Sequence, residues 1–347
     1  MIPLTSISGC LIGTALGDAL GADTEFLNIK GILERFPPNG PQQPEGRPAL
    51  VTDDTQMALA VGDALLAASR PFTLGNLSDE LARTFMAWYD DPENNRAPGN
   101  TCLTACEELL EGKLWVEASQ ISSKGCGANM RVQPVGLLDV DAATRAGIAQ
   151  LQAAMTHGHP TGLAAADLTA FVIADQAHGG DTAGLSARVR QYAESQRGIY
   201  HASWLGELWM RAVMMRTPQM YIGHGWSECL AILDRLDVAL TAQNRTDDPC
   251  SMTGAGWIAE EAFATALLCF LLYPDDPVAT IRRAAVTSGD SDSIACIAGA
   301  FAGARHGLDA WPADWVERIE HRDRLLAMAE GLDMQNKTVN DPLKPEA

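Results

Sequence analysis

The sequence predicts an all-α protein with a compact multi-helix fold. Apolar residues recur three and four positions apart along most of the chain, which is the period of helices that bury one face. Short runs of alternating polarity with β-branched residues, which indicate strands, are hard to find. Apolar residues form 47% of the 347 residues, so the chain can build a sizeable core.

Ten segments carry this helical period. One of them, Gln56 to Ala68, is rich in alanine and leucine and follows threonine and aspartate residues suited to capping a helix. In the next, Leu77, Leu81 and Phe85 fall on one face. The other expected helices are 77–89, 102–110, 146–155, 163–177, 205–215, 229–240, 258–272, 277–286 and 294–304.

One domain over residues 1–332 is the simplest division of the chain, since we find neither an internal repeat nor a low-complexity linker. Residues 333–347 are polar with two prolines and are expected to form a loose tail. The segment from Phe36 to Pro48 holds five prolines, which excludes a helix. We expect an exposed connection there, and both a lid over a site and a surface loop without a role remain open.

The charge balance argues against nucleic-acid binding. Acidic residues outnumber basic ones, 44 to 25, and the formal net charge of −19 repels phosphate backbones at long range. A local basic pocket could still hold a small phosphorylated ligand.

Cysteine usage and the N-terminus favour a cytoplasmic protein that contacts no membrane. The eight cysteines include no Cys-x-x-Cys pair, and several lie in apolar helical runs, as expected for reduced thiols. Cys102 and Cys106 are one helical turn apart, but no histidine lies near them in sequence to complete a zinc site. The first residues lack the basic region of a signal peptide, and no run reaches the roughly 18 continuous apolar residues of a membrane span.

Two acidic clusters stand far apart in the sequence and share one chemistry. Thr52-Asp53-Asp54-Thr55 and Asp290-Ser291-Asp292-Ser293 each place two carboxylates among hydroxyl groups at the start of an expected helix. Taken alone, each cluster is better explained as helix capping, because such side chains accept hydrogen bonds from the first free amides. The second cluster also resembles part of a calcium loop, but it lacks the glycine and distal glutamate that such a loop requires.

The two clusters together indicate a metal-dependent hydrolase. If the two helix starts converge, Asp53, Asp54, Asp290 and Asp292 place four negative charges in one site, and carboxylates that close cannot all stay ionised without a counter-charge. Two divalent cations would balance them, and oxygen ligands suit magnesium or manganese. Paired metals can activate water and hold sugar or phosphate oxygens.

Seven sequence blocks then make the hypothesis more specific. They run in a fixed order over about residues 9 to 305 and comprise 9–21 leading to Glu25, 52–55, 99–101, 125–131, 156–160, 254–261 and 289–293. In these blocks the chain resembles the ADP-ribosylglycohydrolase family, which includes the dinitrogen reductase-activating glycohydrolase and the ADP-ribosylhydrolases. One such block is weak evidence, whereas seven in order are strong evidence.

The resemblance implies an all-helical fold around a binuclear Mg²⁺ centre, with Mn²⁺ as the alternative metal. The metal ligands it implies are Thr52, Asp53, Asp54, Asp290, Asp292 and Ser293, where the serine replaces a threonine often found in the family. The catalytic residues it implies are Glu25, Asp53 and Asp292. The substrate-binding residues it implies are Asn100, Gly127, Ala128, Asn129, Met130, His157 and Trp257.

Structural explanations remain beside these roles. The glycines of residues 9–21 could serve close helix packing. His157 taken alone is better explained as a satisfied buried polar residue, and the tryptophans are by default core residues.

The chain departs from the family at Ala97. Some members that act on ADP-ribosyl-arginine carry an aspartate two residues before the Gly99-Asn100-Thr101 stretch, where this chain has alanine. The departure puts arginine specificity in doubt, and Asp90, Asp91 or Glu93 are candidates to compensate.

We therefore expect hydrolysis at the distal ribose of an ADP-ribosyl group, with a modified protein side chain or ADP-ribose as the partner. Glu25 would transfer the proton and the Gly127 turn would hold the diphosphate. Arginine is the favoured linkage. The alternatives are an immunity protein that neutralises an ADP-ribosyltransferase toxin and a family member that binds ADP-ribose without catalysis.

Overall fold

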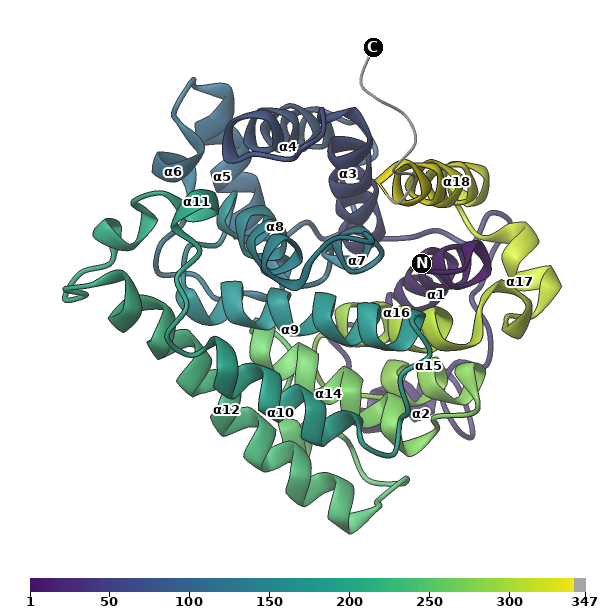
Figure 1. The fold of residues 1–347 in the computed structure, drawn as a ribbon. Coiled ribbons are helices and arrows are strands. Elements are labelled where there is room, and N and C mark those ends of the chain that lie inside the picture. Colours follow the sequence, from purple (N-terminus) through teal and green to yellow (C-terminus); the bar gives the residue numbers. More distant parts are fainter. Residues whose placement is uncertain (340–347) are drawn as a thin grey trace.

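The computed structural model describes residues 1–339, and all regular structure in this range is helical (Figure 1). The helices are α1 (Leu4–Gly21), α2 (Ile29–Arg35), α3 (Asp53–Ala67), α4 (Leu74–Tyr89), α5 (Asn100–Leu110), α6 (Trp115–Ala118), η1 (Cys126–Ala128), α7 (Gln133–Gly136), α8 (Ala142–Ala154), α9 (Pro160–Ala177), α10 (Leu185–Gln196), α11 (Ala202–Leu205), η2 (Leu208–Arg211), α12 (Pro218–Ala242), α13 (Cys250–Thr253), α14 (Ala259–Leu272), α15 (Pro277–Ala285), α16 (Ser291–His306), η3 (Leu308–Ala310), α17 (Ala313–Arg318) and α18 (Arg322–Val339). Within residues 1–339 only three isolated β-bridges occur and no strand, which confirms the all-α prediction.

The helices α1 and α16 pack against each other so closely that their backbones nearly touch. A Cβ atom placed on Gly13 would lie 2.3 Å from the carbonyl oxygen of Gly299, and one on Gly17 would lie 1.9 Å from that of Ala295. Only glycine permits such an approach. The pair runs antiparallel, so the end of α1 meets the start of α16 at Gly21 and Asp292. Close packing, the structural explanation for these glycines, is confirmed, and it brings residues 18–25 beside the second acidic cluster.

The central position of α1 also explains its composition. By length and composition it is the one helix in the described range that could cross a membrane, and 89% of it is buried inside the protein. Contacts with α16, α18 and α15 surround it. Its apolar character therefore reflects a place in the core.

The expected helix 205–215 is wrong. The chain forms the short helices α11 and η2 there, because Gly206 (φ 52°) and Met214 (φ 74°) take left-handed conformations that a helix does not tolerate. Leu205 and Leu208 are core residues, but the apolar pattern does not continue into the core, since Val213 and Met214 are each 87% exposed. The expected helix 229–240 is the middle of the longer α12, and the polar helices α10 and α18 were missed.

The expected tail boundary at residue 333 is also wrong. Residues 333–339 continue α18, and Asp333 and Asn336 are buried. Asn336 accepts a hydrogen bond from the amide of Asp139 (2.8 Å) and donates one to the carbonyl of Leu137 (2.9 Å). The remainder of the expected tail, residues 340–347, lies outside the described residues.

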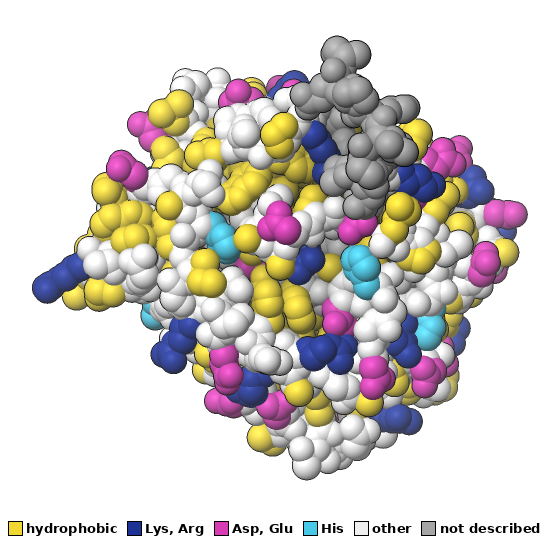
Figure 2. All heavy atoms as spheres, in the orientation of Figure 1, with side chains coloured by type: hydrophobic (Ala, Val, Ile, Leu, Met, Phe, Trp, Pro, Cys, Tyr) yellow, Lys and Arg dark blue, Asp and Glu magenta, His cyan; other side chains and the backbone are white. Residues whose placement is uncertain are grey.

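The proline-rich segment 36–48 contacts α15 and α17. Arg282 donates to the carbonyl oxygen of Gln42 (2.7 and 2.9 Å), and Arg318 donates to that of Pro44. None of its residues lines the cavity that holds the acidic clusters. The lid interpretation is therefore not supported. On the face shown in Figure 2, acidic and basic side chains are interspersed among apolar ones.

Candidate active site

The two acidic clusters and Glu25 line one cavity of about 470 Å³. They come from three parts of the chain: the turn after α1, the start of α3 and the start of α16. The complete lining is Glu25, Phe26, Asp53, Asp54, Ala97, Pro98, Gly99, Asn100, Thr101, Cys102, Gly125, Cys126, Gly127, Met130, His157, Trp257, Asp290, Asp292 and Ser293. The convergence on which the metal-site prediction depended is thus present.

At the start of α3, the capping is done by Asp18 from α1. One carboxylate oxygen of Asp18 accepts from the amide (3.0 Å) and hydroxyl (2.8 Å) of Thr52, and the other accepts from the amide (3.1 Å) and hydroxyl (2.5 Å) of Thr55. The hydroxyl of Thr52 also accepts weakly from the amide of Asp54 (3.4 Å). Because these groups satisfy the free end of the helix, Asp53 and Asp54 are not needed as caps.

The carboxylates of Asp53 and Asp54 are free to face the cavity. Asp53 accepts from the amide of Gly99 (3.3 Å). One oxygen of Asp54, Oδ1, is buried and has no hydrogen-bond partner among the described residues. A buried carboxylate oxygen without a donor is costly unless a cation or a proton satisfies it. Thr52, by contrast, points its hydroxyl at Asp18 and does not line the cavity.

The start of α16 is held by the glycine-rich turn 254–256 and by α1. The amide of Asp290 donates to the carbonyl of Ala255 (2.8 Å), and the hydroxyl of Ser291 donates to that of Gly21 (2.9 Å). The Asp292 carboxylate accepts from the amide of Ser293 (2.9 Å), while the Asp290 side chain makes no capping bond. Glu25, Asp290 and Asp292 each offer an oxygen atom within 4.8 Å of the others.

Burial and mutual repulsion raise the pKa values of four acids in this cavity. Burial, followed by repulsion from Asp292, raises the pKa of Glu25 to about 9 and the pKa values of Asp53, Asp54 and Asp290 well above the ordinary range. Ionised carboxylates in this arrangement require positive charge nearby. The all-oxygen donor set and the unpartnered Asp54 oxygen fit hard divalent cations such as Mg²⁺.

The opposite wall of the cavity is the turn that contains η1. A Cβ atom on Gly127 would lie 2.7 Å from a ring carbon of His157 and 2.8 Å from the sulfur of Cys102, so glycine is required there. Gly125, Gly127 and Met130 line the cavity. Ala128 and Asn129 do not: both are fully buried, and the Asn129 amide donates to the carbonyl of Ala259 (3.2 Å). For these two the structure indicates support of the turn.

His157 is buried in the cavity wall, where burial lowers its pKa well below the ordinary value. Its Nδ1 lies 2.7 Å from the hydroxyl of Thr156, which accepts a hydrogen bond from Arg131 (2.8 Å). Arg131 is itself fully buried and lies over the ring of Phe85 at 4.5 Å. If the Thr156 hydroxyl donates its hydrogen bond to Nδ1, the neutral imidazole carries its proton on Nε2. This nitrogen lies near Gly125 and Gly127.

Two aromatic side chains mark the edge of the cavity. Phe26 and Trp257 stack with ring centroids 5.5 Å apart, and they are 70% and 43% exposed. Trp257 is fixed by its backbone, whose carbonyl accepts from the amide of Cys126 (3.1 Å). Asn100, the first residue of α5, also lines the cavity.

Ala97 lies at the cavity with a left-handed backbone (φ 54°). The residue before it, Arg96, binds the Glu320 carboxylate through both terminal nitrogens (2.5 and 3.0 Å) and donates to the carbonyl of Val51 (2.7 Å). This link ties the loop before α5 to the segment before α3.

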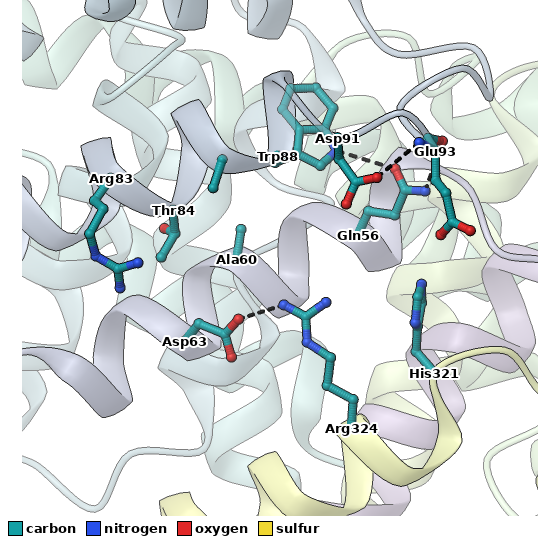
Figure 3. A pocket seen from close by; sticks show the side chains of 11 residues that line it. Gln56, Ala60, Asp63, Arg83, Thr84, Trp88, Asp91, Glu93, His321 and Arg324 are labelled. Carbon is teal, nitrogen blue, oxygen red and sulfur yellow. Dashed lines mark hydrogen bonds and ion pairs between the residues drawn. The ribbon is translucent and has the colours of Figure 1, made fainter.

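The acids proposed to compensate for Ala97 do not reach the cavity. Asp91 and Glu93 line a separate hollow of about 150 Å³ on the outer side of α3, and Asp90 lines neither (Figure 3). In that hollow Arg324 pairs with Asp63, and His321, the residue before α18, faces the space. The compensation hypothesis is therefore wrong for this structure.

Comparison with known proteins identifies the family. The family model described as ADP-ribosylglycohydrolase matches residues 3–342. The chain belongs to the ADP-ribosylglycohydrolase family. It is accordingly a hydrolase of glycosidic bonds, as the sequence blocks predicted.

Related proteins align with almost the whole of this chain. The ADP-ribosylhydrolase ARH3 of Homo sapiens is 27% identical over 95% of this chain and 93% of its own. The ADP-ribosyl-[dinitrogen reductase] glycohydrolase of Rhodospirillum rubrum is 25% identical over 94% of this chain and 96% of its own. A solved ADP-ribosylglycohydrolase-related protein complex has the same fold, with a TM-score of 0.66 and 23% identity over 96% of this chain and 98% of that one.

Two residues of this ADP-ribosylglycohydrolase had no role in the sequence interpretation although the family blocks contain them. Asp18 caps α3, and Arg131 supports His157. Asp18 left a signal, because it is the one charged residue of α1. Arg131 left none, since a single arginine in a turn does not reveal that it is buried.

Proposed function

We propose that the protein is a metal-dependent ADP-ribosylhydrolase that removes ADP-ribose from modified protein side chains by hydrolysis at the distal ribose. The observation that carries the proposal is the convergence of Glu25, Asp53, Asp54, Asp290 and Asp292 on one cavity. Family membership over residues 3–342 supplies the reaction class.

The residues that would hold two Mg²⁺ ions are Thr52, Asp53, Asp54, Asp290, Asp292 and Ser293. Bound there, the ions would supply Lewis-acid polarisation and orientation of ribose hydroxyls and water. The unpartnered Asp54 oxygen supports this assignment. Thr52 is its least supported member, because its hydroxyl already donates to Asp18.

The chain's own groups divide the remaining work. Glu25 lines the cavity and has a raised pKa, so it can hold a proton and deliver it to the leaving group as charge builds on the ribose. Gly125 and Gly127 bring backbone close to the ligand, where it can bind diphosphate oxygens. Trp257 and Phe26 offer aromatic faces at the rim.

Arginine is the linkage to test first. The cavity is lined by carboxylates, which favour a cationic guanidinium over a neutral serine or ester acceptor. Ala97 removes one possible acidic partner, so Glu25 is the one acid of the cavity lining that is not buried. No feature of the described residues favours the immunity-protein or binding-only alternatives.

The eight cysteines are all free and buried, and a cytoplasmic location remains a proposal.

The test measures release of ADP-ribose from proteins modified on arginine, serine or glutamate, with added Mg²⁺ and after chelation. Asp53→Asn and Asp292→Asn should each lower turnover by about 10² or more, because an ionised ligand is lost. The matched control is Asp63→Asn, which changes an aspartate on the outer side of the same helix. Unchanged turnover in Asp53→Asn and Asp292→Asn would overturn the metal assignment, and the absence of release from every substrate would overturn the hydrolase proposal.

A further inference from the structure

A second cavity, of about 460 Å³, lies between α2, the proline-rich segment and α15. Its lining is Ile29, Leu33, Pro38, Asn39, Gln42, Arg245, Thr246, Tyr273, Ala279, Arg282, Arg283 and Val286, none of which lines the first cavity. The volume falls in the range of small-molecule sites. Where the first cavity gathers acids, this one gathers three arginines and no acidic side chain.

None of these three arginines pairs with a carboxylate of the described residues. Arg282 donates to the carbonyl oxygen of Gln42, and Arg245 lies over the ring of Tyr273 at 5.0 Å. Arg283 donates to the carbonyls of Val286 (3.1 Å) and Asp247. Because the partners of these arginines are neutral carbonyl groups and an aromatic ring, no carboxylate balances the three positive charges. This is unusual in a chain of net charge −19.

Arg283 adds a buried donor to this charge. Its residue exposure is only 9%, and its Nε atom is buried without a hydrogen-bond partner in the described structure. A buried guanidinium N–H that lacks an acceptor costs free energy, so Arg283 holds its positive charge in the cavity wall with part of its hydrogen-bonding capacity unused.

Besides the polar Asn39, Gln42 and Thr246, the cavity has a wall that is apolar and aromatic. Ile29, Leu33, Val286 and Pro38 line it beside the ring of Tyr273. We propose that this cavity binds a phosphorylated small molecule, with its phosphate at the arginines and its flat or apolar part against this wall. Arginine groups match phosphate oxygens through paired N–H donors, and the aromatic ring suits a planar group. The inference does not depend on the hydrolase proposal.

The test titrates the full-length protein with adenosine 5′-monophosphate, adenosine and inorganic phosphate in buffer freed of divalent cations. Under these conditions the acidic cavity repels phosphate, so binding reports the arginines. We expect the monophosphate to bind at least about tenfold more tightly than adenosine or phosphate alone, and Arg245→Gln and Arg282→Gln each to weaken it about tenfold.

The control is Arg216→Gln, which changes an exposed arginine before α12 and should leave the affinity unchanged. Arg283 is left intact because its hydrogen bonds to backbone carbonyls support the end of α15 and the loop after α12. Circular dichroism and the urea midpoint of each variant separate lost binding from lost folding. Binding that survives both cavity substitutions, or adenosine that binds as tightly as its monophosphate, would overturn the proposal.

Discussion

Asp18 accepts hydrogen bonds from both the amide (3.0 Å) and the hydroxyl (2.8 Å) of Thr52, the residue directly before the acidic pair. An acid from α1 thereby caps the helix that begins with Asp53. One aspartate is enough to cap a helix, so capping is the simplest explanation for an acidic residue at a helix start. Here the capping carboxylate comes from elsewhere in the chain, and both aspartates are left to line the cavity.

Removing this cap should affect both stability and metal binding. Asp18→Ala leaves the buried amides and hydroxyls of Thr52 and Thr55 without an acceptor, and we expect a loss of about 3 kcal/mol in the free energy of unfolding. The affinity for Mg²⁺ should fall as well, because Asp53 and Asp54 lose their fixed position. Urea denaturation and calorimetric titration with Mg²⁺ measure the two effects. Asp63→Ala, at an exposed ion pair on α3, should cost less than about 1 kcal/mol. Equal behaviour of the two variants would contradict the capping role.

The close approach of α1 and α16 predicts a large difference between two glycine substitutions. Gly17→Ala forces a methyl group against the backbone of Ala295 and should destabilise the protein by about 3 kcal/mol or more. Gly75→Ala, in α4 with no atom within 4 Å of the new Cβ, should stabilise it by up to about 1 kcal/mol. Thermal unfolding distinguishes the two. A Gly17→Ala protein as stable as the parent would mean that the helices do not pack as described.

The acidic cavity predicts an unusual pH dependence of stability. Burial and repulsion from Asp292 raise the pKa of Glu25 from 4.5 to about 9, so the folded state binds more protons than the unfolded state between these values. Without divalent cations, stability should therefore fall as the pH rises through this window. Added Mg²⁺ competes with the protons, and its stabilising effect should grow with pH. Urea midpoints at several pH values, with and without Mg²⁺, test both statements.

The Glu25→Gln variant serves as the control for this pH dependence, because it removes one titrating group and should flatten the slope. A cation-depleted protein that becomes more stable as the pH rises would contradict the assignment, as would a Mg²⁺ effect that does not change with pH.

The same substitution tests the proton transfer itself. Glu25→Gln keeps the shape of the side chain but cannot release a proton, and turnover should fall by about 10² to 10⁴. Substrate affinity should change little, so the substitution should lower kcat and leave KM nearly unchanged. Glu34→Gln, on the exposed side of α2, is the matched control. Turnover of Glu25→Gln within about threefold of the parent would exclude Glu25 as the proton donor.

Much of the fold and the site could be predicted because their signals are local. Helical periodicity gave the class, and the positions of α3, α4, α14 and α16 agree with it. The paired acids at the starts of α3 and α16 indicated a metal site through charge alone. Where the local signal misled, the cause was tertiary: Val213 and Met214 at the end of 205–215 are exposed, and the polar helix α18 is held by buried contacts such as those of Asn336.

The sequence by itself determined the helical class, the family blocks and the two acidic clusters, since each rests on residue type and spacing within a short segment. The tertiary structure decided which carboxylate oxygens are used in helix capping and which are free to face the cavity. It assigned the capping of α3 to Asp18, 34 residues before Thr52, and placed Ala128 and Asn129 behind the cavity wall. It also gathered Arg245, Arg282 and Arg283 into one cavity. The physical reason is that burial and hydrogen bonding depend on contacts between distant segments, which no local pattern records.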